Sequence, residues 1–389
     1  MRISFLPLSA ALTAASCLPS PAAGGFYGDP PDETHPWAIH DMNRPQPRRV
    51  EPGTFSSQEQ PGKPPADAII LFDGSPAALE KWAADKNPPE PTKWIVKDGT
   101  LQCVPGAGYI RSREEFGDCQ LHLEWSAPAK VEGNSQGRGN SGVFLMGQVE
   151  VQVLDNFNNP TYADGFAGSV YGVNPPLVNA LVAPGQWQVY DITFRRPIFK
   201  DGKEIETGYL TVFLNGVLVQ DHTPLEGGGG HMGRSKPHPF PEKGPLKLQD
   251  HGNPVRYRNI WYRPLPKRPA EGGDGSHLSP EATAAQRKAI ATGIRAGADK
   301  LTGRDQMLHL MESLTYEADA ATTTKVGDLA TTWWKSITET PASQLEAKKG
   351  EIMQVHNAVK YLVRFKMLPD SFPLNEGIRK LIKDNSWDK

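Results

Sequence analysis

Short runs of alternating hydrophobic and polar residues fill the middle of the chain. In the run from Val149 to Leu154, valines occupy every second position, and Glu150 and Gln152 lie between them. Successive side chains of a strand point to opposite faces, so this run predicts a strand with an apolar face and a polar face. The run before it, Gly142 to Met146, is separated from it by the turn signal Gly147-Gln148.

The same pattern recurs between turn residues. Asp98-Gly99 and Asn215-Gly216 each separate two runs, which predicts hairpins because such pairs accept a positive φ. No helical pattern lies between the runs, so an antiparallel β-sandwich or jelly roll is favoured over alternating strands and helices. The remaining strand-like runs are Ile69 to Phe72, Trp94 to Val96, Leu101 to Val104, Tyr109 to Arg111, Cys119 to Trp125, Trp187 to Phe194, Tyr209 to Leu214 and Val217 to Asp221.

A second polar stretch runs from Leu246 to Tyr262, as two strand-like runs around a Gly-Asn-Pro turn. Lys247, Gln249 and His251 share one face of the first run. In the second run, two arginines, Arg256 and Arg258, alternate with Tyr257. Such groups are costly to bury without partners, so we expect both polar stretches to face one concave site.

The pattern changes to helical periodicity after Pro266. A linker is expected over 266–278, followed by a small helical bundle over 279–389, with Ser279 and Pro280 beginning its first helix. The expected helices are Glu281 to Leu301, Asp305 to Asp319, Lys325 to Thr338 and Ala342 to Phe365.

The N-terminal segment reads as a secretion signal over 1–24, with one positive charge followed by an apolar run of small residues. This predicts an extracytoplasmic protein, periplasmic or secreted. Cys17 partly matches a lipid-anchoring site, which leaves a lipid-anchored form open. Residues 25–66 have no periodicity and should form an irregular arm whose aromatic residues pack against a folded domain.

Charge and cysteine content narrow the functional classes. A formal net charge of -2 gives no basic field for nucleic acid, and no further apolar run is long enough for a transmembrane segment. Cys103 and Cys119 either pair as a disulfide or remain as two buried thiols. Their spacing does not match a zinc or haem site.

Four motifs together resemble one known family. They are LFDG at Leu71 to Gly74, NSGVFL at Asn140 to Leu145, VEVQVLD at Val149 to Asp155, and LQDHGNPVRYRNIWYRPL at Leu248 to Leu265. In this order they resemble the 3-keto-disaccharide hydrolase domain. The resemblance covers the sandwich expected over 67–265, and implies a concanavalin-like fold, an extracytoplasmic location and a carbohydrate substrate of the 3-keto-glycoside class.

That substrate class calls for a base, groups that stabilise an enediolate oxygen, and an acid. Glu150 and His251 are the two candidate bases. Arg256, Arg258 or a divalent metal ion are candidates for stabilising the oxyanion, and we take Glu150, His251 and Arg258 as the catalytic set. The expected substrate-binding residues are Asn140, Gln152, Asp155, Tyr171, Gln249 and Arg256.

Two long loops, 156–185 and 223–244, are expected to wall a cleft of the size of a sugar. The second contains His231 and His238, but two histidines without a third ligand are a weak metal signal. A sugar 3-dehydrogenase is the expected partner enzyme, because a 3-keto substrate must first be made.

Two alternatives remain. A classical glycosidase needs a second carboxylate about 5–9.5 Å from the first, which would have to come from a loop, such as Asp164, or from Asp250. A non-catalytic carbohydrate-binding sandwich is the rival from another class, since fold alone does not decide function.

Overall fold

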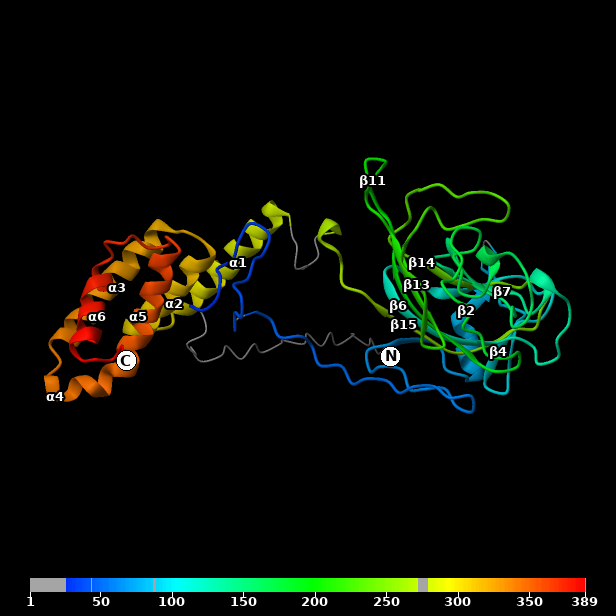
Figure 1. Ribbon diagram of the computed structural model, residues 1–389, viewed down its shortest axis with the longest axis horizontal. Coiled ribbons are helices and arrows are strands. Elements are labelled where there is room, and N and C mark those ends of the chain that lie inside the picture. The colour runs from blue at the N-terminus through cyan, green and yellow to red at the C-terminus, as the bar shows by residue number, and fades with distance from the viewer. Residues whose placement is uncertain (1–25, 43, 87–88, 272–278, 389) are drawn as a thin grey trace, which may run out of the picture. The chain divides into compact units, whose positions relative to one another are not determined.

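A computed structural model describes residues 26–271 and 279–388, apart from 43, 87 and 88. The chain forms two compact units, one comprising the sandwich, Arg48–Asp274, and the other combining the N-terminal segment up to Pro47 with Gly275–Lys389. Figure 1 shows the strands of the first unit and the helices of the second. The expected secretion signal, Cys17 and much of the expected linker lie outside the described residues.

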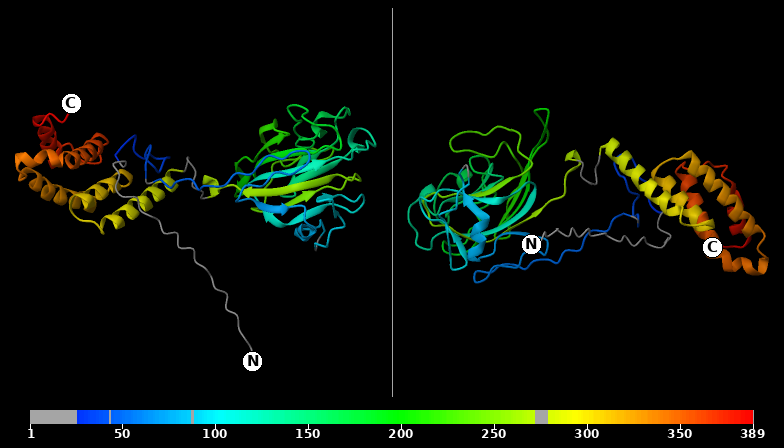
Figure 2. Two further views of the ribbon diagram at one scale, coloured as in Figure 1. Left: turned by 90° about the horizontal axis from the view of Figure 1, so that it is seen from below. Right: turned by 180° about the vertical axis from the view of Figure 1, so that it is seen from behind.

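The first unit is an antiparallel sandwich of two sheets, shown from further sides in Figure 2. The eight-stranded sheet has the order β13 (Val217–Pro224), β12 (Tyr209–Leu214), β9 (Gln188–Arg195), β6 (Cys119–Ser126), β15 (Arg256–Pro264), β4 (Thr100–Gln102) and β3 (Ile95–Lys97), with β1 (Ile69–Phe72) also paired to β15. The five-stranded sheet has the order β2 (Trp82–Ala84), β5 (Ile110–Phe116), β14 (Gly244–Leu248), β7 (Ser141–Leu145) and β8 (Val149–Val153). This architecture confirms the mainly β fold class.

Turn chemistry explains the hairpins that the sequence predicts. Asp98 and Gly99 have φ of 50° and 70°, and Asn215 and Gly216 have φ of 55° and 79°. These left-handed conformations match the twist of the flanking strands. A hairpin that the sequence analysis did not predict, β10 (Ile198–Lys200) with β11 (Lys203–Glu206), uses Asp201-Gly202 in the same way.

The core lies between the two sheets and follows the alternation of the strands. Val149, Val151 and Val153 of β8 are fully buried in it, as are Leu121 and Leu123 of β6. The residues between them therefore point away from the core, on the outer face of each sheet.

The run from Leu246 to Tyr262 is not the hairpin that the sequence suggested. Its first half is β14 in the five-stranded sheet, whereas its second half is β15 in the eight-stranded sheet. The Gly-Asn-Pro segment carries the chain from one sheet to the other, so the two halves share the core but have opposite outer faces. The expectation of one site formed by both runs is wrong for this reason.

The expected arm contains no helix or strand between residues 26 and 66 in its described part. Its first part packs on the helical unit, with Phe26 and Trp37 in edge-to-face contact with Tyr361 and Tyr316. Its second part lies on the eight-stranded sheet. There the hydroxyl of Ser56 donates to Glu124 Oε1 at 2.7 Å, and Ser57 O accepts from Arg258 Nη2.

The helical unit contains six α-helices in its described part: α1 (Pro280–Ala298), α2 (Gly303–Tyr316), α3 (Ala320–Thr338), α4 (Ala342–Leu345), α5 (Lys349–Arg364) and α6 (Pro373–Asp384). Ser279 caps α1 through the backbone N–H of Ala282, as the sequence predicts. The sequence analysis did not predict α6 and joined α4 to α5, which a short 3₁₀ turn at Glu346–Lys348 separates.

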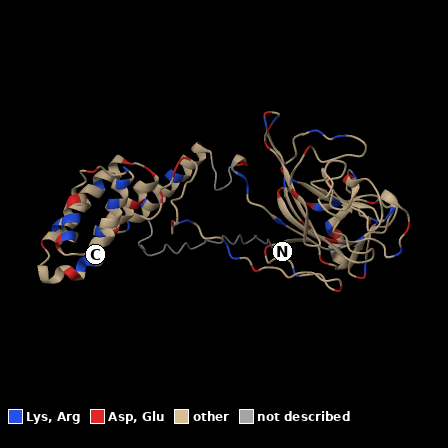
Figure 3. Ribbon diagram, in the orientation of Figure 1, with Lys and Arg blue, Asp and Glu red and all other residues tan. Residues whose placement is uncertain are grey.

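Two further expectations concern the thiols and the membrane. Cys103 and Cys119 are buried free thiols rather than a disulfide, and burial raises the pKa of both. Among the helices of the described residues, none is long and apolar enough to cross a membrane. Lys, Arg, Asp and Glu are distributed over both units (Figure 3).

The second part of the arm should be necessary for a stable sandwich. A fragment spanning 48–274 should melt cooperatively with a β-type circular dichroism spectrum. A fragment spanning 67–274 should be less stable by about 1–3 kcal/mol, because the Glu124–Arg258 pair loses its contacts to Ser56 and Ser57. Equal stability of the two fragments in urea would show that the arm is dispensable.

Candidate active site on the five-stranded sheet

A row of side chains crosses the outer face of the five-stranded sheet. Glu150 of β8 is paired with Phe144 of β7, which is paired in turn with Lys247 of β14. Adjacent strands lie about 4.8 Å apart, so the Cα atoms of Glu150 and Lys247 are separated by roughly 10 Å. Phe144 occupies the position between the two charged residues.

Glu150 is an acid without a partner. Among the residues that the structure describes, no side chain or backbone N–H forms a hydrogen bond or ion pair with its carboxylate, and burial raises its pKa to about 8. Desolvation disfavours the charged form of a carboxyl group, and here no cation offsets it. A perturbed acid of this kind is characteristic of a functional site.

Gly142 makes room for the Glu150 carboxylate. A Cβ atom at position 142 would lie 2.3 Å from Glu150 Oε1, so any other residue would displace the acid or clash with it. The glycine of the NSGVFL motif is therefore explained by the position of Glu150 on the next strand.

Amide groups with unmet hydrogen-bonding capacity lie on the same face. Gln249 Nε2 donates to Tyr109 Oη at 2.7 Å, while its Oε1 atom is buried without a partner within the described part of the chain. Asn140 likewise donates to Gln136 O at 2.6 Å and leaves its Oδ1 atom unpaired. Buried acceptors that lack a partner are costly, and a ligand with hydroxyl groups can supply one. Gln152 differs, because both ends of its amide are engaged, by Gln136 Oε1 and Val153 N.

Lys247 supplies a positive charge to this face. Its Nζ atom lies 2.9 Å from Asp85 Oδ2. The stem of the side chain passes over Gly147, where an added Cβ would lie 2.6 Å from Lys247 Cε. The Lys247 side chain therefore extends toward the turn that joins β7 to β8, the strand of Glu150.

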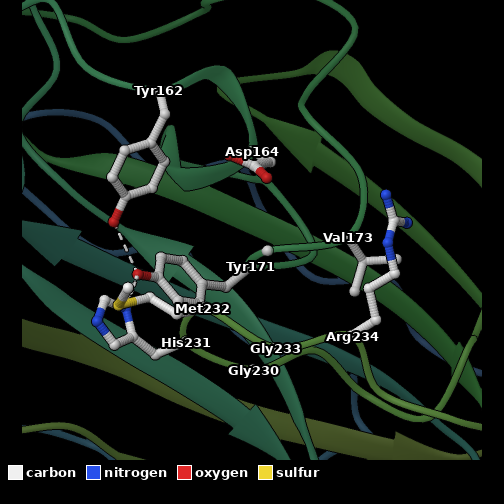
Figure 4. Close-up of a pocket in the computed structure, with 10 residues that line it drawn as sticks. Tyr162, Asp164, Tyr171, Val173, Gly230, His231, Met232, Gly233 and Arg234 are labelled. Carbon is white, nitrogen blue, oxygen red and sulfur yellow. Dashed lines mark hydrogen bonds between the residues drawn. The ribbon is translucent and has the colours of Figure 1, made fainter.

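Loop residues form a pocket of about 390 Å³ beside β8 (Figure 4). In it, Tyr162 Oη and Tyr171 Oη are 2.7 Å apart, and Tyr171 Oη lies 3.2 Å from His231 Nδ1. The backbone N–H of Tyr171 donates to Glu150 O at 3.2 Å, which fixes this loop to the strand. Burial raises the pKa of Tyr171, with contributions from the hydroxyl of Tyr162 and the charge of Glu150. Glu150 does not itself line the pocket, but its charge contributes to the raised pKa of Tyr171, which does.

Two other expected site residues lie outside this arrangement. His251 is exposed in the turn after β14, and its imidazole has no hydrogen-bond partner among the described side chains. Asp155 is buried, and both its oxygens accept hydrogen bonds from Arg138, at 2.7 and 3.2 Å. This bidentate pair anchors the segment that leads into β7, so the Asp155 carboxylate is already engaged.

Arg256 and Arg258 lie on the outer face of the other sheet. Arg258 forms an ion pair with Glu124 Oε2 at 2.7 Å and lies 4.2 Å from the centroid of the Trp187 ring. Arg256 donates to Ser126 Oγ at 3.2 Å. The sandwich core separates both guanidinium groups from Glu150, so neither can stabilise charge on a substrate held by that acid. The structure therefore separates Arg256 and Arg258 from Glu150, because the chain changes sheet between β14 and β15, and their roles in catalysis and substrate binding stay predictions.

Metal ligation receives no support from side-chain geometry. No group of three or more His, Cys, Asp or Glu side chains suited to a metal ion occurs in the described parts of the chain. His231 contacts Tyr171, and His238 Nδ1 lies 3.0 Å from Lys236 O. These contacts lie within the loops.

Sequence analysis missed Lys247, Tyr109 and Asp85 as site residues. Lys247 shares its face with Gln249 in the sequence pattern, which was the available signal. Tyr109 and Asp85 could not be identified in this way, because their position depends on the pairing of β2 with β5, where Asp85 N donates to Tyr109 O at 2.8 Å.

The outer face of the five-stranded sheet thus combines a desolvated acid, unsatisfied amides and tyrosines, which are groups suited to a carbohydrate-active enzyme. A family model for the 3-keto-alpha-glucoside-1,2-lyase-like domain matches residues 67–263, just over half of the chain. The chain belongs to this family.

One solved structure agrees with this assignment. A protein from Parabacteroides distasonis, named as a candidate glycosyl hydrolase, is 40% identical over 58% of this chain and 95% of its own, with a TM-score of 0.55. A second protein of that name and organism is 19% identical over 51% and 94% of the two chains, with a TM-score of 0.37. No curated protein matches the sequence.

The isolation of Glu150 predicts a pH-dependent stability difference. Its folded-state pKa is raised from 4.5 to about 8, so folding favours the protonated form and loses stability as pH rises from about 5 to 9. The melting temperature of Glu150→Gln, relative to wild type, should therefore increase across this range. Glu115→Gln is the control, because it removes an exposed carboxylate of β5 and should leave the pH profile unchanged. Gln152→Glu would not serve as a control, because it adds a charge. A pH-independent difference for Glu150→Gln would contradict the burial argument.

Proposed function

We propose that the chain cleaves 3-keto-glycosides by base-catalysed elimination. The C3 ketone acidifies the hydrogen on C2. A base removes this proton, and the C–H electron pair forms an enediolate. Collapse of the enediolate restores the C3 ketone, forms a C1–C2 double bond and expels the glycosidic oxygen, which takes up the proton that the base removed from C2. Addition of water across the double bond then gives net hydrolysis.

The observation that carries this proposal is the unpaired carboxyl of Glu150. A general base is most effective when its pKa lies near the working pH, and burial raises the pKa of Glu150 to about 8. The ionised form is the base, so kcat/KM should rise with pH toward this value. His251 is the weaker candidate, because it is exposed and the structure gives it no orienting partner among the described residues.

Lys247 is the best candidate for the cation that stabilises the enediolate oxygen. It lies in the same row as Glu150, with Phe144 between them, and its ion pair with Asp85 holds it on this face. A fixed positive charge near the developing oxyanion lowers the barrier without reorganisation. Tyr109, Gln249 and Asn140 then contact the sugar hydroxyls, and the loop with Tyr162, Tyr171 and His231 surrounds the aglycone.

A classical glycosidase finds less support on this face. Such an enzyme needs two carboxylates flanking the scissile bond. Asp85 is paired with Lys247, and Asp250 accepts hydrogen bonds from the backbone N–H groups of Gly108 and Gly252. Asp164 lines the loop pocket, and is the remaining carboxylate that this rival mechanism could use.

The substrate class implies an oxidation upstream and a location outside the cytoplasm. An oxidoreductase must convert the C3 hydroxyl of a glycoside to a ketone before this chemistry starts. The apolar N-terminal sequence supports an extracytoplasmic site of action, periplasmic or secreted.

Deuterium exchange distinguishes elimination from classical hydrolysis. In deuterated water, a 3-keto glycoside should gain deuterium at C2 in recovered substrate or product, and the matching unoxidised glycoside should remain intact. Glu150→Gln should lower turnover by about 10²–10⁴-fold. Cleavage of the unoxidised glycoside without deuterium at C2 would instead indicate a two-carboxylate glycosidase.

Lys247→Met and Arg258→Met form a matched pair that separates the two faces. Lys247→Met should lower kcat much more than it raises KM, because the lost charge acts mainly in the transition state. Arg258→Met leaves Glu124 buried without its cation and should cost about 3–5 kcal/mol of stability, with the kcat of the remaining folded enzyme little changed. Urea denaturation and steady-state kinetics of both variants test this, and the reverse pattern would return the oxyanion role to Arg258.

A further inference from the structure

A second cavity lies on the opposite face of the sandwich. It has a volume of about 590 Å³ and is bounded by the arm on one side and the outer face of the eight-stranded sheet on the other. Small-molecule sites typically span roughly 300–1,000 Å³. Its lining includes Phe55, Ser56, His122, Trp187, Asp191, Asn259 and Trp261.

The floor of this cavity is a fixed arrangement of polar and aromatic groups. His122 Nδ1 lies 2.7 Å from Asp191 Oδ1, and its ring stacks on Trp261 with centroids 4.9 Å apart. The side chain of Asp191 is 46% exposed, so its carboxylate remains accessible beside the histidine. Trp261 is 6% exposed, and its indole N–H has no acceptor among the described residues. The cavity therefore offers an accessible acceptor and aromatic surface, beside a buried indole N–H without a partner in the described structure.

The cluster is unsuited to nucleophilic catalysis, although Ser56, His122 and Asp191 all line the cavity. The hydroxyl of Ser56 donates to Glu124 Oε1 and accepts from Gly62 N, both at 2.7 Å, so it is fully engaged. Burial opposes protonation of His122, but Asp191 and Glu124 outweigh it and raise its pKa to about 9. A protonated imidazole cannot accept the proton of a serine, so these three residues do not form a catalytic triad.

Charge balance indicates what kind of ligand fits. The cations His122 and Arg258 are matched by the carboxylates Asp191 and Glu124, and Asn259 Nδ2 donates to Glu124 Oε1 at 2.9 Å. The groups at the floor therefore balance in charge, and Lys63 of the arm is the remaining charged residue of the lining. Phe55 and Trp187 add ring surface, which suits the apolar C–H faces of a sugar.

We propose that this cavity is a second, non-catalytic site that binds a neutral saccharide of one or two units. It requires no ketone at C3, so it takes ordinary glycosides that the Glu150 face does not cleave. Asp191 accepts hydrogen bonds from the sugar hydroxyls, and Phe55 covers the ring from the arm. The two sites lie on opposite outer faces of one sandwich and can be occupied together.

The test measures binding of unoxidised cellobiose, maltose and sucrose to the full chain by isothermal titration calorimetry. At least one should bind with a millimolar or tighter Kd. Asp191→Asn and Phe55→Ala should each weaken it by about tenfold or more, since each removes a ligand contact. Phe55 is fully exposed, so its removal leaves the fold intact, and the melting temperature of each variant verifies this.

Two controls assign the binding to this face. Ile205→Ala removes an exposed apolar residue from β11, away from the cavity lining, and should leave Kd unchanged. Glu150→Gln should also leave Kd unchanged, whatever its effect on turnover, so the outcome is independent of the proposed reaction. The proposal is overturned if none of the three sugars binds, or if Glu150→Gln weakens binding while Asp191→Asn and Phe55→Ala do not.

Discussion

Packing of two sheets against one apolar core is the constraint on which the rest of the molecule depends. Because side chains alternate along a strand, each valine or leucine turned into the core places its neighbours on an outer face. Glu150 is on the outer face of the five-stranded sheet because Val149 and Val151 are in the core, and Glu124 is on the other face because Leu123 and Trp125 are. Two polar surfaces result, separated by the core.

The two glutamates show how a fold distinguishes a structural acid from a chemical one. Burial alone would raise the pKa of Glu124, but His122, Ser56, Asn259 and Arg258 together lower it, and the group is a satisfied part of the framework. Glu150 has no such partners in the described structure, and its pKa is raised to about 8. A buried carboxyl group that lowers stability and has no hydrogen-bond or ion-pair partner is typical of an active site, where a perturbed pKa serves catalysis. Gly142 leaves space for the Glu150 carboxylate, because any side chain at position 142 would clash with it. The neighbouring strand is therefore matched to the presence of the acid.

The sequence was sufficient for the fold class and for part of the site. Alternation identified Glu150 and Gln249 on polar faces, and Asp-Gly and Asn-Gly pairs located two hairpins, because both signals are local. The assignment failed where the answer depended on which strands pair. The sequence pattern predicts one shared site for Arg258 and Gln249, because only a short turn separates their strands. In the structure the chain changes sheet between β14 and β15, so the two residues lie on different faces. Lys247 and Asp85 come together across strands far apart in sequence, and no local pattern reports such a contact.

Direct titration of the Glu150 carboxyl tests the central claim most simply. In protein labelled with ¹³C at the glutamate side-chain carboxyl, the signal absent from Glu150→Gln identifies this group, and its chemical shift can be followed with pH. An inflection near pH 8 is the result expected from a buried acid without a partner. An inflection near 4.5, the ordinary value for glutamate, would show that the carboxyl is solvated or paired, and would contradict its assignment as the base.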